Sequence, residues 1–402
     1  MTVVIMGGGA SGLMAAYAAG QCGHAVTIIE KNSRMARKVL ITGKGRCNLT
    51  NNCDMQTLID NIPRNARFLY SAFSRYTPQV IMQLFEDNGV PLKTERGNRV
   101  FPQTDRAVDI VDALVEMGTL GAKVVNGSVA ELITDGGAVV GVRLADGRKI
   151  TADHTVVCTG GRSYPLTGST GDGYKLARSV GHTVTPIRPS LVPIDCKDKW
   201  VSQLAGLSLR NVAVTVTRGD KQLYTDFGEM LFTHTGVSGP TVLSASAHFD
   251  NCDRCTLHID LKPALTHEML EARVMRDFDK YKNRNLPNAL HELLPRSMID
   301  VFVGLTGIDP TRKINSITRA ERAAFVKLFK DFTLDISGFR PIDEAIITRG
   351  GVSTREIDPK TMRSKLIDGL SFAGEVIDVD AYTGGFNLQI AFATGLVAGS
   401  SI

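Results

Sequence analysis

The N-terminal pattern of apolar residues predicts a βαβ unit. A short apolar run covers residues 3–6, and the segments GGGASGLMAAYAAGQCGH and AVTIIE follow it directly. A short apolar run bounded by glycines is typical of a buried strand, whereas an alanine-rich segment of this length favours a helix. The expected order is therefore strand, glycine turn, helix and second strand.

A similar pattern recurs near the C-terminus. The segment LSFAGEVIDV predicts a strand and a turn, and NLQIAFATGLVAGS predicts a helix that ends the chain. Both ends have the order strand, turn and helix. We therefore expect them to form one α/β, Rossmann-like nucleotide-binding domain.

The middle of the chain has a different texture. Residues 126–154 alternate between apolar and polar positions around two Asp-Gly pairs, which predicts β-hairpins. Short β-like segments such as NVAVTVTRGDKQLY begin near residue 190, and a polar stretch of helical period begins near residue 267. We predict a nucleotide-binding domain in two parts, 1–189 and 343–402, and an insertion at 190–342 with a β part at about 190–265 and a helical part at about 266–342.

Composition narrows the class of protein. The chain has 402 residues, of which 43% are hydrophobic, and this is enough to bury a large core. Its net charge of +5 is common among soluble enzymes and is weak support for a nucleic-acid partner. Seven cysteines spread over a long chain do not resemble a disulfide framework. No segment approaches the roughly 18 uninterrupted apolar residues of a membrane helix, so we expect a soluble, cytoplasmic protein.

The first glycine turn has the spacing of a dinucleotide-binding motif. Gly7, Gly9 and Gly12 follow the first strand, and Glu30 ends the second strand. Glycines at this spacing allow a tight turn, the approach of a pyrophosphate and close packing of helix on strand, while the acid accepts from a ribose hydroxyl. A glycine-rich turn that binds nothing is the alternative. The complete strand, helix, strand and acid context favours dinucleotide binding.

The C-terminal segment indicates which dinucleotide is bound. Gly374 and Glu375 follow a strand, and TGGFN precedes the last helix. An extended FAD needs this second contribution because its flavin lies far from its adenosine, and Glu375 or Asp378 would accept from its hydroxyls. Backbone N–H groups near Asn387, at a helix N-terminus, would stabilise negative charge on the reduced flavin. A glycine-rich helix entry that only packs is the alternative. No second GxGxxG follows a strand, so NAD(P)H is expected only as a transient reductant.

The loop ITGKGRCNLTNN, at residues 41–52, places cations and a thiol among glycines and asparagines. Lys44 and Arg46 in this loop, with Arg37 and Lys38 just before it, would neutralise a pyrophosphate, an anionic substrate or reduced flavin. For Arg37 and Lys38 the alternative is a solvated helix face.

Five segments together identify a family. GGGASGLMAA, RKVLITGKGRCNLTNN, TGGRSYPLTGSTGDGY, GEMLFTHTGVSGP and AGEVIDVDAYTGGFNLQIAFATG resemble the BaiN and aminoacetone-oxidase-like flavoproteins, a group that also includes RdsA, a ribosomal RNA dihydrouridine synthase. The resemblance implies a two-dinucleotide-binding FAD fold with an inserted β-barrel and a helical substrate domain. The chain departs from the usual family pattern at Thr42, Phe386 and Ile390, which leaves substrate choice open.

Motif position and resemblance together give the expected FAD contacts. These residues are Gly7, Gly9, Ser11, Gly12, Glu30, Lys31, Arg37, Lys38, Gly45, Arg46, Val129, Thr159, Gly160, Gly374, Glu375, Asp378, Gly385, Asn387 and Leu388.

Cys47 has two interpretations in this setting. Reduction of a uracil ring needs a hydride at C6 and a proton at C5, and a thiol is a suitable acid for that proton. Arg46 opposes this role because an adjacent cation lowers the thiol pKa below about 8.5 and favours the thiolate. Cys47 therefore serves as an acid only if burial offsets the cation or water resupplies the proton. The alternative is a buried thiol that packs against the flavin.

Two further clusters are weaker candidates. His234 lies in FTHTGVSGP, just before an expected helix that begins at Pro240. It is either a substrate contact or alternative acid, or a histidine satisfied within a loop. The spacing of histidines and cysteines at 248–258 suggests zinc, but it lacks the second ligand pair that makes such spacing specific. We therefore expect no metal site.

The helical part of the insertion carries two basic stretches, at residues 280–284 and 312–322. These stretches would follow RNA phosphates, with a flipped uridine entering the flavin site. They are interleaved with acidic residues, so solvated helix faces explain them equally well.

We expect an FAD-dependent oxidoreductase. The resemblance implies reduction of a uridine in large-subunit ribosomal RNA to dihydrouridine with NAD(P)H as reductant. An oxidase or reductase of a small amine, ketone or enone is one alternative. A flavin-bearing RNA-binding factor without turnover is another.

Overall fold

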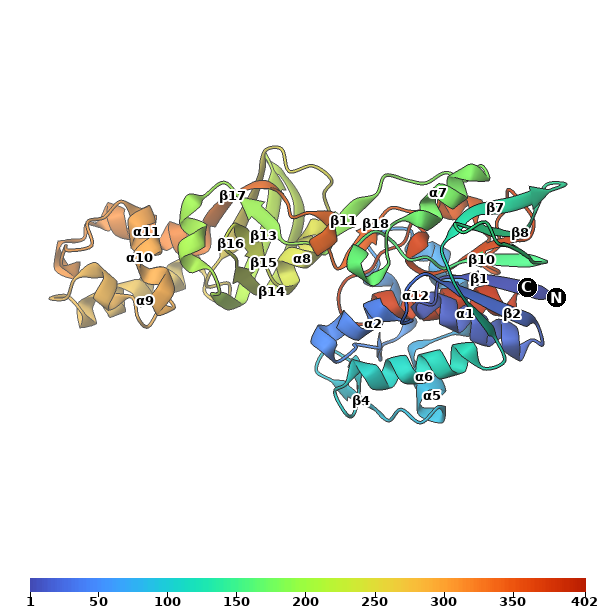
Figure 1. Ribbon diagram of the computed structural model, residues 1–402. Helices are drawn as coiled ribbons and strands as arrows, with labels where there is room; N and C mark the ends of the chain where they lie inside the picture. Colours follow the sequence, from blue (N-terminus) through green and yellow to red (C-terminus); the bar gives the residue numbers. More distant parts are fainter. The chain divides into compact units, whose positions relative to one another are not determined.

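The computed structural model describes residues 1–402, and the chain forms two compact units (Figure 1). The first unit contains Met1–Ser190 and Pro341–Ile402, and the second contains Leu191–Arg340. The sequence predicts 190–342 for the same insertion. Each unit has its own cluster of buried apolar side chains.

A five-stranded parallel sheet forms the centre of the first unit. Four of its strands are short, apolar and almost completely buried, as expected for a sheet covered on both faces, whereas the edge strand at residues 123–126 is mostly exposed. In spatial order they are β19 (Leu370–Phe372), β10 (His154–Val157), β1 (Thr2–Met6), β2 (Ala25–Glu30) and β6 (Lys123–Asn126). The strand next to the C-terminal helix therefore lies in the same sheet as the N-terminal strands, as the sequence predicts.

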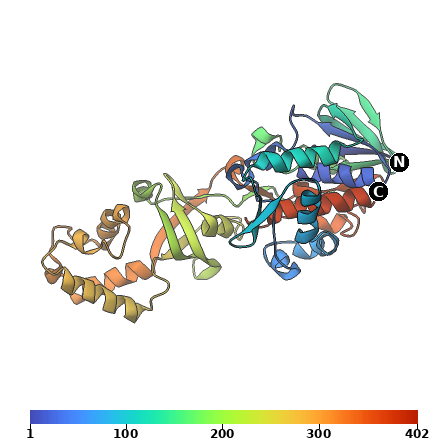
Figure 2. The same ribbon diagram turned by 90° about the horizontal axis from the view of Figure 1, so that it is seen from below.

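Helices α1 (Ala10–Gln21) and α12 (Phe386–Ser400) lie side by side against this sheet (Figures 1 and 2). A Cβ on Gly395 would lie 2.4 Å from the carbonyl oxygen of Ser11, and one on Gly399 would lie 2.2 Å from that of Ala15. Only glycine permits this approach of two backbones. Both contacts advance in the same direction along the chain, so the two helices run parallel and begin at the same end of the sheet.

Smaller elements complete the first unit. The predicted hairpins are confirmed as the antiparallel sheet β7 (Val129–Asp135), β8 (Ala138–Leu144) and β9 (Lys149–Thr151), which lies on the other face of the parallel sheet (Figure 1). The other strands are β3 (Thr50–Asn51), β4 (Leu92–Glu95), β5 (Arg99–Pro102), β11 (Arg188–Ser190) and β18 (Ile347–Arg349). The other helices are α2 (Arg37–Ile41), α3 (Met55–Asp60), α4 (Tyr70–Arg75), α5 (Pro78–Asp87), α6 (Ala107–Thr119) and α7 (Asp172–Ser179).

The second unit contains a closed six-stranded barrel and four helices. In spatial order the barrel strands are β12 (Ile194–Cys196), β15 (Gly236–Ser238), β14 (Lys221–Phe232), β13 (Ser208–Arg218), β16 (Cys255–Asp260) and β17 (Phe332–Phe339). The helices are α8 (Pro240–Ser246), α9 (His267–Lys280), α10 (Arg296–Thr306) and α11 (Arg319–Lys330).

The end of the insertion differs from the prediction. Residues 266–342 were expected to be helical, but β17 follows the helices and closes the barrel between β12 and β16. The apolar residues Phe332, Leu334 and Ile336 are buried and alternate with exposed residues. This period-two pattern favours a strand over a helix.

No disulfide bond joins the cysteines of this chain. All seven cysteines are free thiols, and six of them are at least partly buried: Cys47, Cys53, Cys158, Cys196, Cys252 and Cys255. None of the helices combines the length and the apolar character needed to cross a membrane.

Candidate functional site

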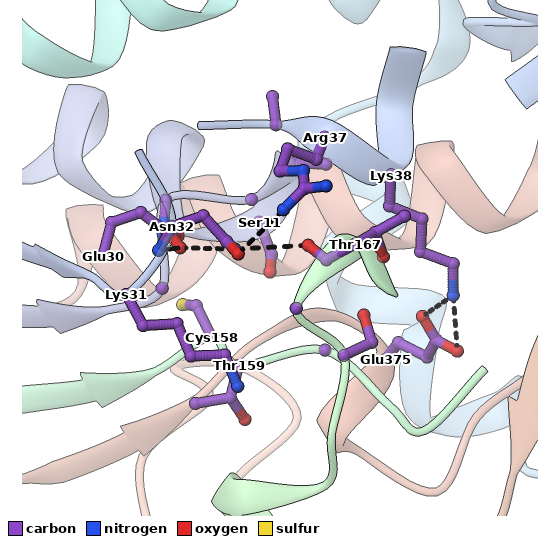
Figure 3. Close-up of a pocket in the computed structure, with 18 of the residues that line it drawn as sticks. Ser11, Glu30, Lys31, Asn32, Arg37, Lys38, Cys158, Thr159, Thr167 and Glu375 are labelled. Atoms are coloured by element: carbon purple, nitrogen blue, oxygen red, sulfur yellow. Dashed lines mark hydrogen bonds and ion pairs between the residues drawn. The ribbon is translucent and has the colours of Figure 1, made fainter. Parts of the chain in front are cut away.

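A cavity in the first unit lies at the carboxyl ends of the parallel strands (Figure 3). The empty space among its lining atoms, including the part that is open to solvent, is about 1250 Å³. Most of the predicted FAD contacts line it: Gly7, Gly9, Ser11, Glu30, Lys31, Arg37, Lys38, Val129, Thr159, Gly160, Glu375, Asn387 and Leu388.

Three predicted glycines lie behind the cavity wall and shape it. A Cβ on Gly12 would lie 1.8 Å from the carbonyl oxygen of Gly7, and one on Gly374 would lie 2.4 Å from the hydroxyl of Ser11. A Cβ on Gly385 would lie 2.3 Å from the carbonyl of Thr50. These glycines allow close packing of the backbone behind the cavity.

The start of α1 offers a site for a pyrophosphate. Gly9 caps the helix without a side-chain hydrogen bond, and the first helical bond runs from Leu13 N–H to Gly9 O at 3.0 Å. The N–H groups of residues 10–12 therefore have no acceptor within the protein. A Cβ on Gly9 would meet nothing within 4 Å. Free N–H groups, a positive helix end and open space above the glycine fit a phosphate.

Glu30 is held rigidly at the end of β2. One carboxylate oxygen accepts from Gly8 N–H at 2.8 Å, and the other accepts from the backbone N–H and the side-chain Nδ2 of Asn32 at 2.7 and 2.8 Å. Arg37 in turn donates to Asn32 Oδ1 at 3.1 Å (Figure 3). A carboxylate accepts about four hydrogen bonds, so Glu30 retains capacity for a ribose hydroxyl. The role of Asn32 was not predicted, although its place just after the strand-ending acid was a usable signal.

Lys38 and Glu375 form an ion pair on the cavity wall, with 2.7 Å between Nζ and the nearer carboxylate oxygen (Figure 3). Lys38 also donates to the hydroxyl of Ser163 at 2.6 Å, and Glu375 accepts from the backbone N–H of Thr348 at 2.9 Å. Ser163 and Thr348 were not predicted. The Ser163 hydroxyl and the Thr348 backbone N–H reach these groups only after distant segments have packed together, so sequence position alone gave no signal for them.

Lys31 is also paired on the cavity wall. Its ammonium group lies 2.7 Å from the carboxylate of Asp172 and 2.5 Å from the hydroxyl of Thr170. Asp172 begins α7, in the TGDG turn. The carboxylate of Asp172 has a lowered pKa: burial raises it, but hydrogen bonds from Lys31 and Thr170 and the nearby cations outweigh the burial. The acid therefore stays ionised and keeps Lys31 in place.

The start of α12 gives the cavity a second helix N-terminus. The Asn387 side chain is occupied, because its Oδ1 accepts from Ala381 N–H at 2.9 Å and its Nδ2 donates to Ala381 O at 2.8 Å. The first helical bond runs from Gln389 N–H to Gly385 O at 3.1 Å. Backbone N–H groups of the first turn are therefore the donors that Asn387 and Leu388 offer to a ligand, and they favour negative charge.

Arg46 lies outside the cavity lining, and its charge is already balanced. Its guanidinium group lies 2.5 Å from the carboxylate of Glu95, pairs with Asp105 and stacks 4.1 Å from the ring centre of Phe101. Gly45 is exposed beside it and does not line the cavity either.

Cys47 is completely buried, and burial raises the pKa of its thiol to about 12. The expectation that Arg46 would favour the thiolate is therefore corrected, because Arg46 is paired elsewhere and desolvation is the largest influence on this thiol. Thr42 beside the thiol exerts a smaller, opposite influence on this pKa, and Thr42 lines the cavity. Cys47 and Lys44 both adopt left-handed backbone, each with φ of 58°. Such strain in residues other than glycine is concentrated at functional sites.

The last predicted cavity residue, Asp378, does not line the cavity. Its carbonyl oxygen accepts from the side chain of Asn65 at 2.7 Å. The other predicted candidate, His234, belongs to the second unit, where it is exposed between β14 and β15. The helix that follows begins at Pro240, as predicted.

The histidine and cysteine cluster at 248–258 makes other contacts. Cys255 donates to the carbonyl of Asn251 at 3.5 Å. His258 bonds to Asp331 at 2.7 Å and to Thr217 at 3.0 Å. No group of three or more histidine, cysteine or acidic side chains is arranged to hold a metal ion.

One protein family matches almost the whole chain. The family model described as "HI0933-like protein Rossmann domain" matches residues 1–401. The chain belongs to this family. The HI0933-like match, the parallel sheet and the cavity with two helix N-termini agree, and the protein is an FAD-dependent oxidoreductase.

Three curated relatives extend over nearly the whole HI0933-like chain. A 3-dehydro-bile acid delta(4,6)-reductase from Clostridium scindens is 32% identical over 403 residues and covers 98% of this chain and 97% of its own. A ribosomal RNA dihydrouridine synthase from Haemophilus influenzae is 31% identical over 405 residues, covering 99% and 98%. A ribosomal RNA dihydrouridine synthase from Escherichia coli is 29% identical over 392 residues, covering 97% and 95%.

Solved structures share the fold at low sequence identity. The Sdh1 complex of Mycobacterium smegmatis in the apo form superposes with a TM-score of 0.51 at 18% identity, covering 99% of this chain and 67% of its own. The 3-ketosteroid delta1-dehydrogenase of Sterolibacterium denitrificans superposes with a TM-score of 0.50 at 13% identity. The superposition covers 99% of this chain and 98% of the dehydrogenase. At these identities the likeness concerns the fold alone.

Proposed function

We propose that this protein reduces a uridine of large-subunit ribosomal RNA to dihydrouridine, with NAD(P)H as the reductant of its FAD. The observation that carries the proposal is the pair of relatives named ribosomal RNA dihydrouridine synthase. They are 31% and 29% identical to this chain and align with 99% and 97% of it. The alignment therefore includes both the cavity and the inserted unit.

The cavity residues divide the work of holding the cofactor. The start of α1 and Glu30 suit the pyrophosphate and the adenosine ribose, and the start of α12 suits the flavin end. When bound, FAD supplies a flavin that NAD(P)H can reduce and that, once reduced, can donate a hydride. The chain itself must orient the uracil ring, exclude water and provide the proton that C5 receives.

Cys47 is the proposed source of that proton, acting through Thr42. Burial raises the pKa of the Cys47 thiol to about 12, so it remains protonated near neutral pH. Thr42 is the polar side chain beside this thiol; its hydroxyl donates to Val39 O at 2.7 Å, and the residue lines the cavity. The side chain that faces the substrate is thus Thr42, and Cys47 is a positioning and proton-supplying residue behind it.

Replacing Cys47 by alanine tests this role. The Cys47→Ala variant should bind FAD and be reduced by NAD(P)H at the wild-type rate, yet form dihydrouridine at least about 100-fold more slowly, as expected for loss of a general acid. The pH profile of product formation should also change. An unchanged rate and profile would assign Cys47 to packing alone.

A second candidate is reduction of a small enone. The bile-acid reductase from Clostridium scindens is 32% identical over 98% of this chain. Its name and that of the synthases both describe addition of hydrogen to a carbon–carbon double bond in a ring that carries a carbonyl group. The same proton donor and flavin site suit either ring.

Deletion of the gene tests the favoured substrate. Mass spectrometry of nucleosides from large-subunit ribosomal RNA should show loss of dihydrouridine in the deletion strain, and its return when the wild-type gene is supplied. The purified holoenzyme, given NADPH and either ribosomal RNA or 3-keto-4-ene steroids, distinguishes the two candidates. Persistence of dihydrouridine in the deletion strain, together with steroid turnover, would replace the first candidate by the second.

A further inference from the structure

Two basic segments of the second unit, residues 281–285 and 312–315, lie side by side. They are joined by an antiparallel bridge between Asn285 and Lys313. Ile314 N–H donates to Arg284 O at 3.0 Å, and Asn315 N–H donates to Lys282 O at 3.0 Å. Cations that are about 30 positions apart in the sequence are therefore presented together, beside helices α9, α10 and α11 (Figures 1 and 2).

Acidic partners account for only some of the cations in this region. Lys280 lies 2.6 Å from the carboxylate of Glu292, and Arg312 lies 2.5 Å from that of Glu321. Four other cations are exposed and form no ion pair, and we call them the cation patch: Lys282, Arg284, Lys313 and Arg319.

Two acids close to the patch in sequence, Asp309 and Glu321, are already engaged. The carboxylate of Asp309 accepts from the backbone N–H and the hydroxyl of Thr311 at 2.8 and 2.7 Å. Glu321 is held by Arg312 and by the backbone N–H of Thr318, which completes the capping box of α11. The pKa of Glu321 is lowered to about 2 by these hydrogen bonds, so both acids stay ionised and locally bound.

Folding stability does not explain the patch. Arg319 occupies the first position of α11, where a cation faces the positive end of the helix dipole and is unfavourable. The exposed side chains of Asn283, Asn285 and Asn315 lie between the cations and make no hydrogen bond within the protein. The surface thus offers four positive charges and several free amide groups to an external partner.

We propose that the cation patch binds the sugar–phosphate backbone of RNA. This proposal rests on the proposed function, and it adds the surface by which the inserted unit would hold the substrate. Charge complementarity favours a polyanion, and the amide groups suit phosphate oxygens and ribose hydroxyls. An anionic membrane is the less suitable partner, because membrane-binding surfaces add exposed apolar anchors. Here Ile314 of the second segment is buried, as are Leu286 and Ile317, which lie just after the two segments.

The test compares two variants of the holoenzyme with equal loss of charge. The patch variant is K282Q/R284Q/K313Q/R319Q. The matched control is K123Q/K149Q/R178Q/K360Q, whose four side chains are exposed, form no ion pair and lie in the first unit away from the cavity lining. Binding of a fluorescein-labelled hairpin from large-subunit ribosomal RNA is followed by fluorescence anisotropy over a series of salt concentrations.

We expect the patch variant to bind the hairpin at least about 10-fold more weakly than the control. The slope of log affinity against log salt should fall by about 3, because four lost phosphate contacts each contribute about 0.7–0.9. Both variants should keep the wild-type flavin spectrum and the same rate of flavin reduction by NAD(P)H.

The outcomes separate this proposal from the proposed function. Equal RNA binding by both variants overturns the patch, even if dihydrouridine is still formed. Loss of binding in the patch variant supports the patch, even if the wild type forms no dihydrouridine, in which case the proposed reaction alone fails. Binding of phosphatidylglycerol vesicles, but not RNA, through the patch would also overturn the proposal.

Discussion

The ammonium group of Lys38 lies 2.7 Å from the carboxylate of Glu375, although 337 positions separate the two residues in the chain. Lys38 follows the first βαβ unit, and Glu375 follows the last strand of the same sheet. The pair therefore joins the two parts of the FAD-binding unit at the cavity wall, and Thr348 and Ser163 hold it from a third and a fourth segment.

Replacing Lys38 by methionine should destabilise this unit. Both side chains of the pair are mostly buried, with exposures of 23% and 13%, so the loss should lie between that of an exposed pair and that of a fully buried one, about 1–3 kcal/mol. Urea unfolding of the FAD-free protein measures it. The control R143M breaks the exposed pair with Glu131 and should cost no more than about 1 kcal/mol. Equal losses in the two variants would contradict a structural role for Lys38.

Gly9 and Gly12 should respond differently to alanine. A Cβ at Gly9 meets nothing within 4 Å, whereas one at Gly12 would lie 1.8 Å from Gly7 O. We therefore expect G9A to fold with wild-type stability but to bind FAD at least about 10-fold more weakly, because the methyl group occupies space needed by the pyrophosphate. G12A should lose stability itself. Circular dichroism melting and FAD titration measure the two effects, and wild-type FAD affinity in G9A would contradict the proposed phosphate position.

Glu30 should affect both the cofactor and the local turn. The variant E30A removes the acceptor for Gly8 N–H and for both donors of Asn32. FAD affinity should fall by about 10- to 100-fold, in line with the ~1.5–3 kcal/mol of a hydrogen bond to a charged group. The variant N32A keeps the carboxylate and should lose less affinity. If N32A weakens FAD binding as much as E30A does, the turn, and not the carboxylate, governs affinity.

Alkaline pH should destabilise the folded state through Cys47. Burial raises the folded-state pKa of the thiol from 9.0 to about 12, so between these values the folded state holds a proton that the unfolded state has lost. Stability therefore falls as pH rises above 9.0, by about 2 kcal/mol at about pH 10.5. The C47A variant lacks this thiol, so its free energy of unfolding should not fall for this reason. The difference in free energy of unfolding between C47A and the wild type should therefore shift by about 2 kcal/mol in favour of C47A between about pH 8 and about pH 10.5.

Urea unfolding at the two pH values tests this linkage. The control C22A removes an exposed thiol and should follow the pH dependence of the wild type. A parallel pH dependence of C47A and the wild type would mean that the Cys47 thiol is not desolvated in solution.

The sequence determined the parts of the fold that depend on local patterns. The sequence predicts the dinucleotide site from Gly7, Gly9, Gly12 and Glu30. This is possible because a tight turn, a helix start and a strand-ending acid depend on residues that are neighbours in the chain. The two Asp-Gly turns predict the hairpins for the same reason. The alternation of Phe332, Leu334 and Ile336 also indicates the strand β17. The prediction included these residues in a helical region because the residues before them have a helical pattern.

Only the tertiary structure decided the partners of charged and buried groups. Arg46 was expected at the cofactor, but folding brings Glu95 and Asp105 to its guanidinium group. The protonation of Cys47 depends on its complete burial, which the cation next to it in sequence does not reveal. The ion pair of Lys38 with Glu375 and the meeting of the two basic segments of the second unit likewise require distant segments to pack. Electrostatic interactions and desolvation depend on distance in space and on access to water, and neither quantity is encoded in local sequence order.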